Sequence, residues 1–281
     1  MSLIITGASG HLGRRTAELL LDTEGVDAGD VVLITRDPSK LDDLAARGAT
    51  VRAGDFSQAS TLPDAFAGAT RVLIVSTDVV GARVPGHKAA IDAAKAAGAQ
   101  LIAYTSLPNP VAANPAGVAA DHRETEEALQ ASGIPYTFLR NALYAEYQIP
   151  GAQAAAASGK HYYNSGDGKT AYVSREDCAA AAAAVLAGGD EHANKAYDIT
   201  GPELLSGADL ARIFGAEPVA VDDDAFAAAL PPEIAPLLVS FGVAIREGFL
   251  DQRSDDVEAL TGRAPRALSD VLAAAGVGAT A

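Results

Sequence analysis

Short apolar runs alternate with longer helical patterns over the first half of the chain, and this alternation limits the possible folds more than any other feature. Several of the runs, such as VVLI at 31–34 and VLIV at 72–75, are continuously apolar. Continuous apolar strands are buried on both faces, as in a parallel sheet with helices on either side. The pattern therefore predicts an α/β fold with a doubly wound parallel sheet of the Rossmann type and right-handed crossovers.

The predicted elements follow in a regular order along the chain. Strands are expected at 3–6, 31–34, 50–53, 72–75, 101–105, 136–139 and 195–201. Helices are expected at 12–22, 38–47, 59–67, 85–97 and 119–132. The alanine-rich run 179–187 is predicted to be a helix interior, because alanine is the best helix former, with Ser174 or Asp177 as the N-cap.

A glycine-rich loop, TGASGHLG at 6–13, lies between the first strand and the first helix. The three glycines permit a tight turn, a close approach of the backbone to a pyrophosphate, and close packing of the helix on the strand. Backbone N–H groups and the helix N-terminus then hold the phosphates. An ordinary glycine-rich turn is the alternative. The loop predicts a dinucleotide site formed by Gly7, Ala8, Ser9, Gly10, His11, Leu12 and Gly13.

The end of the second predicted strand carries Arg36, where an NAD site usually carries Asp or Glu. A guanidinium can bind a 2′-phosphate through two hydrogen bonds, whereas a carboxylate would repel it. The sequence therefore predicts NADP(H) over NAD(H). The alternative is a solvated arginine at a strand end, and the adjacent Asp37 could form a salt bridge with Arg36.

Two residues after the third predicted strand stand where such folds often place an adenine contact. These residues are Asp55 and Phe56. The Asp55 side chain could equally cap a helix that starts near Ser57. The two interpretations of Asp55 have equal weight at this point.

Charge and cysteine content exclude several classes of partner. Lys and Arg number 21 and Asp and Glu number 36, which gives a formal net charge of −15. Nucleic-acid binders need basic patches, and no basic run occurs, so we expect neither nucleic acid nor a membrane as partner. No signal peptide or apolar run of about 18 residues is found. Cys178 is the only cysteine, which favours the cytoplasm, and no metal site is predicted.

The regular alternation loosens after about residue 145. Residues 202–281 contain most of the prolines of the second half, with several short helical patterns and no strong strand. We therefore expect residues 1–145 to form an NADP-binding Rossmann domain. Residues 146–281 are expected to form a smaller α/β lobe that binds the substrate and is partly intermixed with the first domain.

The spacing G-x-x-G-x-x-G resembles the short-chain dehydrogenase/reductase superfamily, whose members commonly use a Ser and a Tyr-x-x-x-Lys pair. Ser106 matches the Ser position, whereas Val118 stands at the usual tyrosine and His122 at the usual lysine. The standard proton donor is missing. Such a site suits quinone-like acceptors, whose reduced form spreads its charge, or no catalysis at all. His122 could donate a proton or orient the acceptor, or it could be a packing residue.

Longer segments resemble the NmrA-like branch of atypical short-chain reductases. The segments are TGASGHLG, ITRDPSK, KAAIDAAKAAGAQLIAYTSL, DHRETEEAL, SGIPYTFLRNALYAEY and GDGKTAYVSREDCAAAAAAVL. The resemblance runs from residue 1 to about 200 and more faintly to the end. Within the branch, the sequence is most similar to flavin-free bacterial NADPH:quinone oxidoreductases, with triphenylmethane reductase as a near relative.

The resemblance implies direct hydride transfer from NADPH to a quinone or similar conjugated acceptor. It implies that residues 7–12 hold the pyrophosphate, that Arg36 holds the 2′-phosphate, and that residues 142–147 flank the nicotinamide. It also implies a role beside the ribose and nicotinamide for the loop that contains Ser76, Asp78 and Val80. Asn141 and Tyr144 would face the substrate, with packing between the lobes as the alternative for Tyr144 and Tyr147. A histidine also occupies the place of His122 in this branch, whereas an aromatic residue often stands where this chain has Leu143.

Two function classes stay open. The first is an NADPH-dependent quinone reductase that acts as a monomer or homodimer. The second is a non-catalytic NADP-binding redox sensor of the NmrA type, for which the missing Tyr-x-x-x-Lys pair is equally expected. A sugar-nucleotide epimerase is less favoured, because those enzymes typically keep the Tyr and the Lys.

Overall fold

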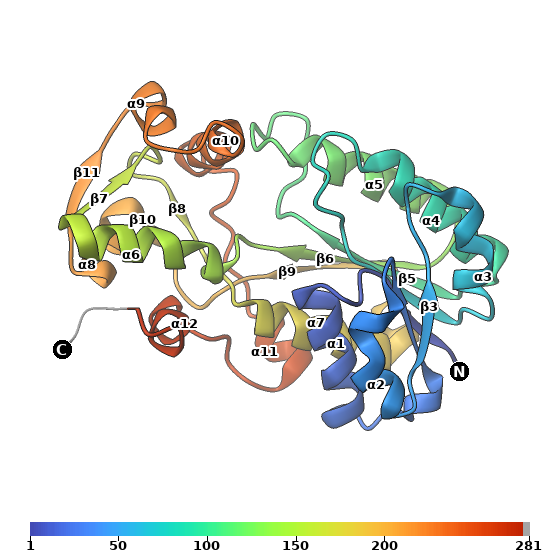
Figure 1. The fold of residues 1–281 in the computed structure, drawn as a ribbon. Coiled ribbons are helices and arrows are strands. Elements are labelled where there is room, and N and C mark those ends of the chain that lie inside the picture. The colour runs from blue at the N-terminus through green and yellow to red at the C-terminus, as the bar shows by residue number, and fades with distance from the viewer. Residues whose placement is uncertain (278–281) are drawn as a thin grey trace. The chain divides into compact units, whose positions relative to one another are not determined.

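The computed structural model describes residues 1–277 as an α/β fold built on a seven-stranded sheet (Figure 1). The strand order is β3-β2-β1-β4-β5-β6-β9, and neighbouring strands from β3 through β6 pair in parallel. This order reverses direction at β1, as in a doubly wound Rossmann sheet. The predicted fold class is therefore confirmed.

The sheet strands agree with the predicted ones to within a few residues at each end. They are β1 (Leu3–Ile5), β2 (Val31–Thr35), β3 (Thr50–Ala53), β4 (Arg71–Ile74), β5 (Leu101–Ser106), β6 (Tyr136–Asn141) and β9 (Lys195–Ile199). The helices that alternate with them are α1 (His11–Asp22), α2 (Asp42–Ala46), α3 (Leu62–Phe66), α4 (Val84–Ala96), α5 (Ala119–Ser132) and α7 (Arg175–Gly188).

Two of the predicted helices are shorter than expected, because each begins as a 3₁₀ turn. The turn Pro38–Leu41 precedes α2, and the turn Ala59–Thr61 precedes α3. Pro63 lies in the first turn of α3, where its ring suits the start of a helix but disfavours helical continuation through the preceding residue.

The chain forms two compact units, and each unit consists of three segments that alternate along the sequence with those of the other unit. Unit 1 comprises Met1–Ser106, Asp121–Arg140 and Cys178–Tyr197, and unit 2 comprises Leu107–Ala120, Asn141–Asp177 and Asp198–Ala281. The predicted division after residue 145, with the second part partly intermixed with the first, stays a prediction. The assignment of cofactor binding to the first part and substrate binding to the second part stays a prediction.

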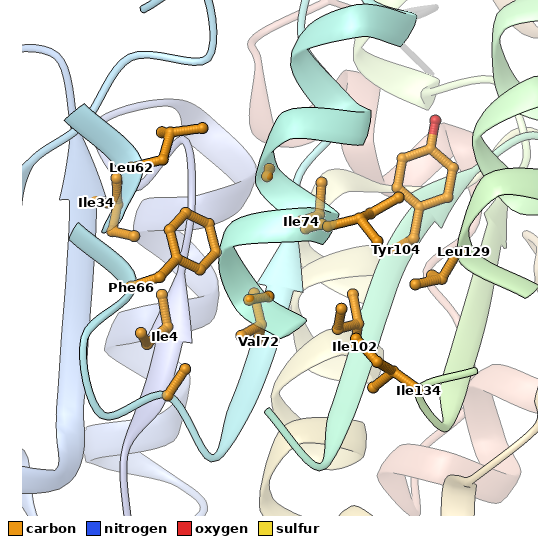
Figure 2. Packing of buried hydrophobic residues seen from close by; sticks show 14 of the residues in the cluster. Ile4, Ile34, Leu62, Phe66, Val72, Ile74, Ile102, Tyr104, Leu129 and Ile134 are labelled. Atoms are coloured by element: carbon orange, nitrogen blue, oxygen red, sulfur yellow. The ribbon is translucent and has the colours of Figure 1, made fainter. Parts of the chain in front are cut away.

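The core of unit 1 lies between the sheet and three helices. Figure 2 shows side chains of β1, β2, β4 and β5 meeting those of α3 and α5, among them the fully buried Phe66 and Tyr104. The alternate side chains of the strands, such as Leu3, Ile5 and Leu33, are buried as well. Burial on both faces explains why the strand sequences are continuously apolar.

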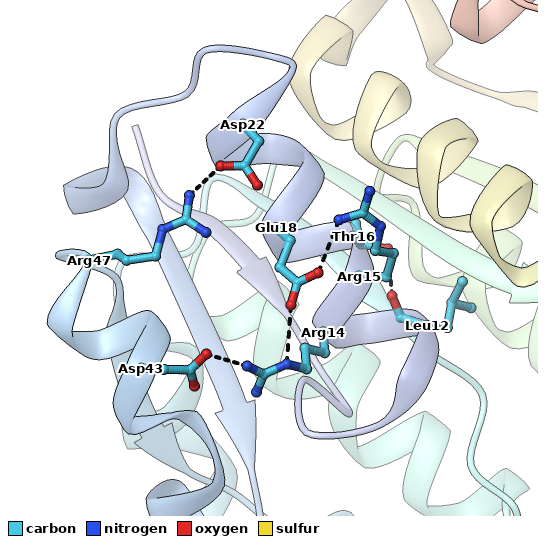
Figure 3. A network of polar contacts seen from close by, with 8 residues as sticks. All are labelled: Leu12, Arg14, Arg15, Thr16, Glu18, Asp22, Asp43 and Arg47. Atoms are coloured by element: carbon cyan, nitrogen blue, oxygen red, sulfur yellow. Dashed lines mark hydrogen bonds and ion pairs between the residues drawn. The ribbon is translucent and has the colours of Figure 1, made fainter.

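Ion pairs join the first two helices at the surface of unit 1. Arg14 contacts both Glu18 and Asp43, and Arg15 contacts Glu18 (Figure 3). Arg47 pairs with Asp22 in the same network. Exposed pairs of this kind contribute little stability individually.

Unit 2 contains two small sheets and most of the remaining helices. Its strands are β7 (Lys160–Tyr163), β8 (Lys169–Thr170), β10 (Leu205–Ser206) and β11 (Glu217–Ala220), with β7 parallel to β11 and β8 antiparallel to β10. Its helices are α6 (Ile149–Ser158), α8 (Gly207–Phe214), α9 (Asp223–Ala228), α10 (Ala235–Arg246), α11 (Asp256–Thr261) and α12 (Leu268–Ala274).

Residues 202–281, where the sequence shows no strong strand, contain the short strands β10 and β11. The sequence did not locate β11. Its sequence, EPVA, is mostly exposed and includes a proline, so it carries no apolar run that marks a strand. The strand forms through pairing with β7, a partner far away in the sequence. Such a pairing cannot be read from local pattern.

The start of α7 resolves the choice of N-cap. The Ser174 hydroxyl oxygen accepts a hydrogen bond from the Asp177 N–H at 3.0 Å, so Ser174 is the cap. Asp177 is fully buried, and its carboxylate accepts hydrogen bonds from Ser174, Arg263 and the Arg266 N–H. Among residues 1–277, no helix has the length and apolar character needed to cross a membrane.

Candidate active site

The glycine loop leaves several backbone N–H groups available at the start of α1. The Ala8 N–H donates to the Ile34 carbonyl and the Gly10 N–H donates to the Gly7 carbonyl, at 3.0 and 2.9 Å. The N–H groups of Ser9, His11 and Leu12 donate to no acceptor within residues 1–277. Because these donors lie at the positive end of a 12-residue helix, the loop can bind an anion.

Two glycines of the loop are required by its shape. Gly7 has a φ of +60°, in the left-handed region that favours glycine. A Cβ atom at Gly13 would lie 2.6 Å from the Gly7 carbonyl oxygen, so α1 can pack this closely on the loop only without a side chain there. The backbone thus forms a cradle that a methyl group would fill.

A hydroxyl contact joins the loop to the end of β2. The Thr35 Oγ1 atom donates to the Ser9 Oγ atom at 2.8 Å and accepts from the Asp37 N–H at 3.2 Å. Thr35 is almost wholly buried. Sequence reasoning missed this residue, although a hydroxyl directly before Arg36 at a strand end was a usable signal.

A cavity of about 800 Å³ opens beside the loop within unit 1. Of the predicted cofactor residues, those that line it are Gly7, Ser9, Gly10, Arg36, Asp55, Phe56, Ser76 and Asp78. The predicted residues that do not line it are Ala8, His11, Leu12, Gly13 and Val80. Thr77 and Val79, inside the predicted loop 76–80, also line it, and lining residues that sequence reasoning missed include Thr35, Gly54, Ser57, Arg83, Pro85 and Gly86. The cavity size suits a ligand of dinucleotide dimensions.

Arg36 lies at the cavity with its guanidinium unpaired. It is exposed, and no hydrogen bond or ion pair to it occurs in the described part of the chain. Asp37 does not pair with it, because the Asp37 carboxylate accepts from the Ser39 N–H and hydroxyl at 3.3 and 2.7 Å. These bonds from Ser39 lower the pKa of Asp37. The guanidinium is therefore available for an anionic ligand.

Asp55 stabilises a turn and does not cap a helix, because the next helical turn begins at Ala59 with Gln58 at its N-cap. Its carboxylate accepts from the Ser57 N–H and hydroxyl at 2.9 and 2.8 Å, which fixes the turn after β3 and lowers the pKa of Asp55. It also borders the cavity together with Phe56. The helix-cap interpretation is therefore wrong, and the adenine contact stays a prediction.

His122 lies on α5 in a buried polar environment. Its Nδ1 atom lies 2.9 Å from the Tyr104 hydroxyl oxygen. Burial lowers the pKa of His122 well below its ordinary value, and the nearby Arg83 and His87 act in the same direction. The imidazole is therefore neutral near pH 7. Its Nε2 atom has no hydrogen-bond partner within residues 1–277.

Ser106 donates its hydroxyl proton to a buried carboxylate. The Ser106 Oγ atom lies 2.6 Å from the Glu126 Oε1 atom. Glu126 also accepts two hydrogen bonds from Arg140, at 3.1 and 2.8 Å. Glu126 stands four residues after His122, so both lie on the same side of α5. Sequence reasoning missed Glu126 and Arg140, and this helical spacing was the signal that could have found Glu126.

Asn141 and Tyr144 belong to unit 2 and contact each other. The Asn141 Nδ2 atom donates to the Tyr144 hydroxyl oxygen at 3.5 Å, and the buried Asn141 Oδ1 atom has no partner within residues 1–277. The Arg175 guanidinium lies 5.4 Å from the ring centre of Tyr144 and 5.0 Å from that of the exposed Tyr147. Arg175 had no predicted role, since a cation–π contact depends on chain folding.

The described residues offer no set of side chains that could bind a metal ion. Within residues 1–277, no group of three or more His, Cys, Asp or Glu side chains could hold a metal ion.

Comparisons with known proteins agree with these features. A family model described as NAD(P)H-binding matches residues 7–188. The chain is 38% identical to quinone oxidoreductase 2 of Escherichia coli strain K12 over 279 residues, which covers 95% of this chain and 96% of that protein.

Solved structures give the same result. A crystal structure of an NADPH-dependent quinone oxidoreductase of Escherichia coli complexed with NADPH has a TM-score of 0.89 and 37% identity, covering 98% of this chain and 99% of that one. A triphenylmethane reductase of Citrobacter sp. has a TM-score of 0.88 and 30% identity, again covering 98% and 99%. The glycine cradle, the matched model and these similarities together show that the chain belongs to the NAD(P)H-binding family.

Proposed function

We propose that this protein is an NADPH-dependent reductase that passes a hydride directly to a quinone or a similar conjugated acceptor. The observation that carries the proposal is a cavity whose wall includes Ser9 and the Arg36 guanidinium, beside the N–H groups of Ser9, His11 and Leu12 at the start of α1. Within residues 1–277, neither the guanidinium nor these N–H groups have a hydrogen-bond partner. The similarity to a quinone oxidoreductase over 95% of the chain supports the acceptor class.

The residues of the cavity fit NADPH. When bound, this cofactor supplies the hydride. We assign the pyrophosphate to the N–H groups of Ser9, His11 and Leu12, and the 2′-phosphate to Arg36. The net charge of −15 opposes an anionic ligand at long range, so these local donors must provide the binding energy.

We assign the remaining parts of the cofactor to other residues of the cavity wall. Asp55 and Phe56 are assigned to the adenine end, and the loop that contains Ser76 and Asp78 to the nicotinamide ribose. Val80 lies in the same loop but not on the cavity wall, so its predicted contact has the least support.

His122 is assigned a hydrogen-bonding role toward the acceptor. With Nδ1 accepting from the Tyr104 hydroxyl, the neutral ring carries its proton on Nε2, which has no hydrogen-bond partner among the described residues 1–277. A neutral imidazole is a weak acid, so Nε2–H stabilises the reduced oxygen instead of transferring a proton. Because a hydroquinone anion spreads its charge, a hydrogen bond can suffice, and water supplies the proton that completes the hydroquinone.

The acceptor contacts proposed for unit 2 are Asn141 and Tyr144. The unpartnered Asn141 Oδ1 atom can accept a hydrogen bond from a ligand, which would satisfy a buried polar group. Leu143 stands where relatives of this branch often carry an aromatic residue, which leaves the acceptor a smaller stacking surface. Ser106 is the predicted catalytic position with the least support, because its proton is donated to Glu126.

The second candidate is a redox sensor that binds NADP(H) without turnover. Two observations favour the sensor: the Ser106 hydroxyl donates its proton to Glu126, and the sequence has no Tyr-x-x-x-Lys pair. Purified protein is mixed with NADPH and 1,4-benzoquinone, and NADPH absorbance is followed. Steady oxidation proportional to protein supports the reductase. Tight NADPH binding without turnover across several quinones and dyes supports the sensor.

Location and assembly complete the proposal. We propose a cytoplasmic protein, a monomer or a homodimer, with no nucleic-acid or membrane partner. Light scattering of the protein as it elutes from a size-exclusion column measures its mass in solution. A mass larger than that of a dimer would contradict the proposed monomer or homodimer.

A further inference from the structure

The cavity wall includes an irregular loop, and residues that do not themselves line the cavity hold this loop in its conformation. The loop follows β4, and the residues from Ser76 through Val79, with Ala82 and Arg83, line the cavity. Val79 and Val80 are exposed, at 56% and 40%, so packing of these side chains does not hold the loop. The loop is held instead by polar contacts: Thr105 bonds to Ser76, and Asp121 and His87 hold the rest of the loop.

Asp121, on α5, holds the far end of the loop. Its Oδ2 atom accepts from the Gly81 N–H at 2.7 Å and from Arg83 Nε at 3.0 Å. Arg83 in turn donates through Nη1 to the Thr77 carbonyl oxygen at 3.0 Å. The Arg83 and Asp121 side chains are only 5% and 10% exposed. One buried ion pair therefore connects both ends of the 77–83 segment to α5.

His87, on α4, holds the near end of the loop. Its Nε2 atom accepts from the Thr77 N–H at 3.2 Å, and its Nδ1 atom lies 3.0 Å from Thr125 Oγ1. The single Thr125 hydroxyl proton goes to the Asp121 carbonyl oxygen at 2.8 Å, so Thr125 must accept from His87 Nδ1–H. These partners fix the ring as neutral, with its proton on Nδ1.

We infer that Asp121 and His87 are positioning residues for NADPH binding, because together they fix Thr77, Gly81 and Arg83 in the arrangement that forms the cavity wall. The inference rests on the proposed cofactor. Buried ion pairs add little net stability but select one geometry, and pre-formed binding walls gain affinity by avoiding ordering costs. Neither residue is among the cavity-lining residues, so each acts through the loop.

Two substitutions at His87 separate the loop contact from general packing. His87→Gln places an amide oxygen near the Nε2 position, where it can still accept from the Thr77 N–H. His87→Asn reaches only the Nδ1 position, so it keeps a partner for Thr125 and loses Thr77. Loss of one hydrogen bond to the loop is expected to weaken NADPH binding about tenfold.

The measurement is the NADPH dissociation constant by fluorescence titration of the full chain, with thermal unfolding as a parallel readout. We expect His87→Gln within about threefold of the unmodified protein and His87→Asn weaker by about tenfold, with similar unfolding temperatures. Equal NADPH affinities for the two variants overturn the inference. Absence of NADPH binding by the unmodified protein overturns the proposed function instead.

A charge-neutralising variant gives an independent test through Asp121. Asp121→Asn leaves Arg83 without its carboxylate, so the KM for NADPH is expected to rise about tenfold while kcat at saturating NADPH changes less than about twofold. Asp92→Asn, an exposed carboxylate on α4, is the matched control. A purely structural role would be indicated by a fall in unfolding temperature with no change in that KM, and this would overturn the inference.

Discussion

The Tyr104 hydroxyl oxygen lies 2.9 Å from His122 Nδ1, and both side chains are buried. Burial raises the pKa of Tyr104 and lowers that of His122, so both groups are neutral over the physiological range. The contact fixes the orientation of an imidazole whose other nitrogen has no partner among residues 1–277. This pairing is the basis for assigning His122 a donor role toward the acceptor.

Replacement of His122 tests that donor role. His122→Phe keeps the ring volume and removes Nε2–H, so kcat for benzoquinone reduction is expected to fall about a hundredfold. The NADPH dissociation constant should stay within about twofold, because no cofactor contact is removed. An unchanged kcat would show that His122 is a packing residue. His122→Gln, which retains an N–H donor, should recover part of the lost rate.

Replacement of Arg36 tests the cofactor preference. Arg36→Glu places a carboxylate at the proposed 2′-phosphate site, so NADPH is repelled while NADH is not. We expect the ratio of kcat/KM for NADPH over NADH to fall at least about a hundredfold. Arg47→Glu, at an exposed arginine outside the cavity, is the control and should leave the ratio unchanged. Identical ratios for both variants would refute the assignment.

An added methyl group tests the glycine cradle. Gly13→Ala would place Cβ 2.6 Å from the Gly7 carbonyl oxygen, so the loop or α1 must move. We expect NADPH affinity to fall at least about tenfold and the free energy of unfolding to fall by about 1–3 kcal/mol. Gly151→Ala adds the same group to α6 in open space, so it should preserve NADPH affinity and leave the free energy of unfolding unchanged or raise it by up to about 1 kcal/mol. Native affinity in Gly13→Ala would show that the loop tolerates a wider geometry than the structure shows.

Buried histidines predict how stability depends on pH. Burial, with a smaller effect of Arg83, lowers the pKa of His87 to about 4, and burial lowers that of His161 to about 4. The unfolded chain then binds protons that the folded chain excludes, so stability is fully present above pH 6.5 and declines toward pH 4. Each group contributes up to about 1.4 kcal/mol per pH unit in that window.

The measurement is the free energy of unfolding in urea at intervals from neutral pH down to the lower limit of this window. His87→Gln removes one titrating group, so its slope against pH should be smaller by up to one proton. Carboxyl groups with lowered pKa values, such as Asp55 and Asp209, act mainly below this range. A slope that is the same in both proteins would mean that His87 is not neutralised by burial.

The sequence predicted the elements whose causes are local. Continuous apolar runs located central strands of the main sheet such as β2 and β4, and the loop glycines located the turn that starts α1, because both depend on neighbouring residues. The strand β11 was missed because its exposed EPVA sequence is stabilised by β7, not by its own pattern. Pairing between distant segments has no local signal.

The residues of the candidate site divide in the same way, into those that the local sequence specifies and those whose roles depend on how distant segments pack. Gly7, Gly10 and Arg36 were found at the cavity because motif and position specify them. The residues behind the cavity wall, His87 and Asp121, were missed. Their roles arise from α4 and α5 packing beside the loop after β4, and nothing in their own segments distinguishes them from ordinary helix residues.

Calorimetric titration of the purified protein with NADPH, and separately with NADH, tests the central claim most directly. The account predicts saturable binding of one NADPH per chain, with weaker binding of NADH because it lacks the 2′-phosphate that Arg36 is proposed to hold. Absence of NADPH binding, or equal affinity for the two nucleotides, would contradict it.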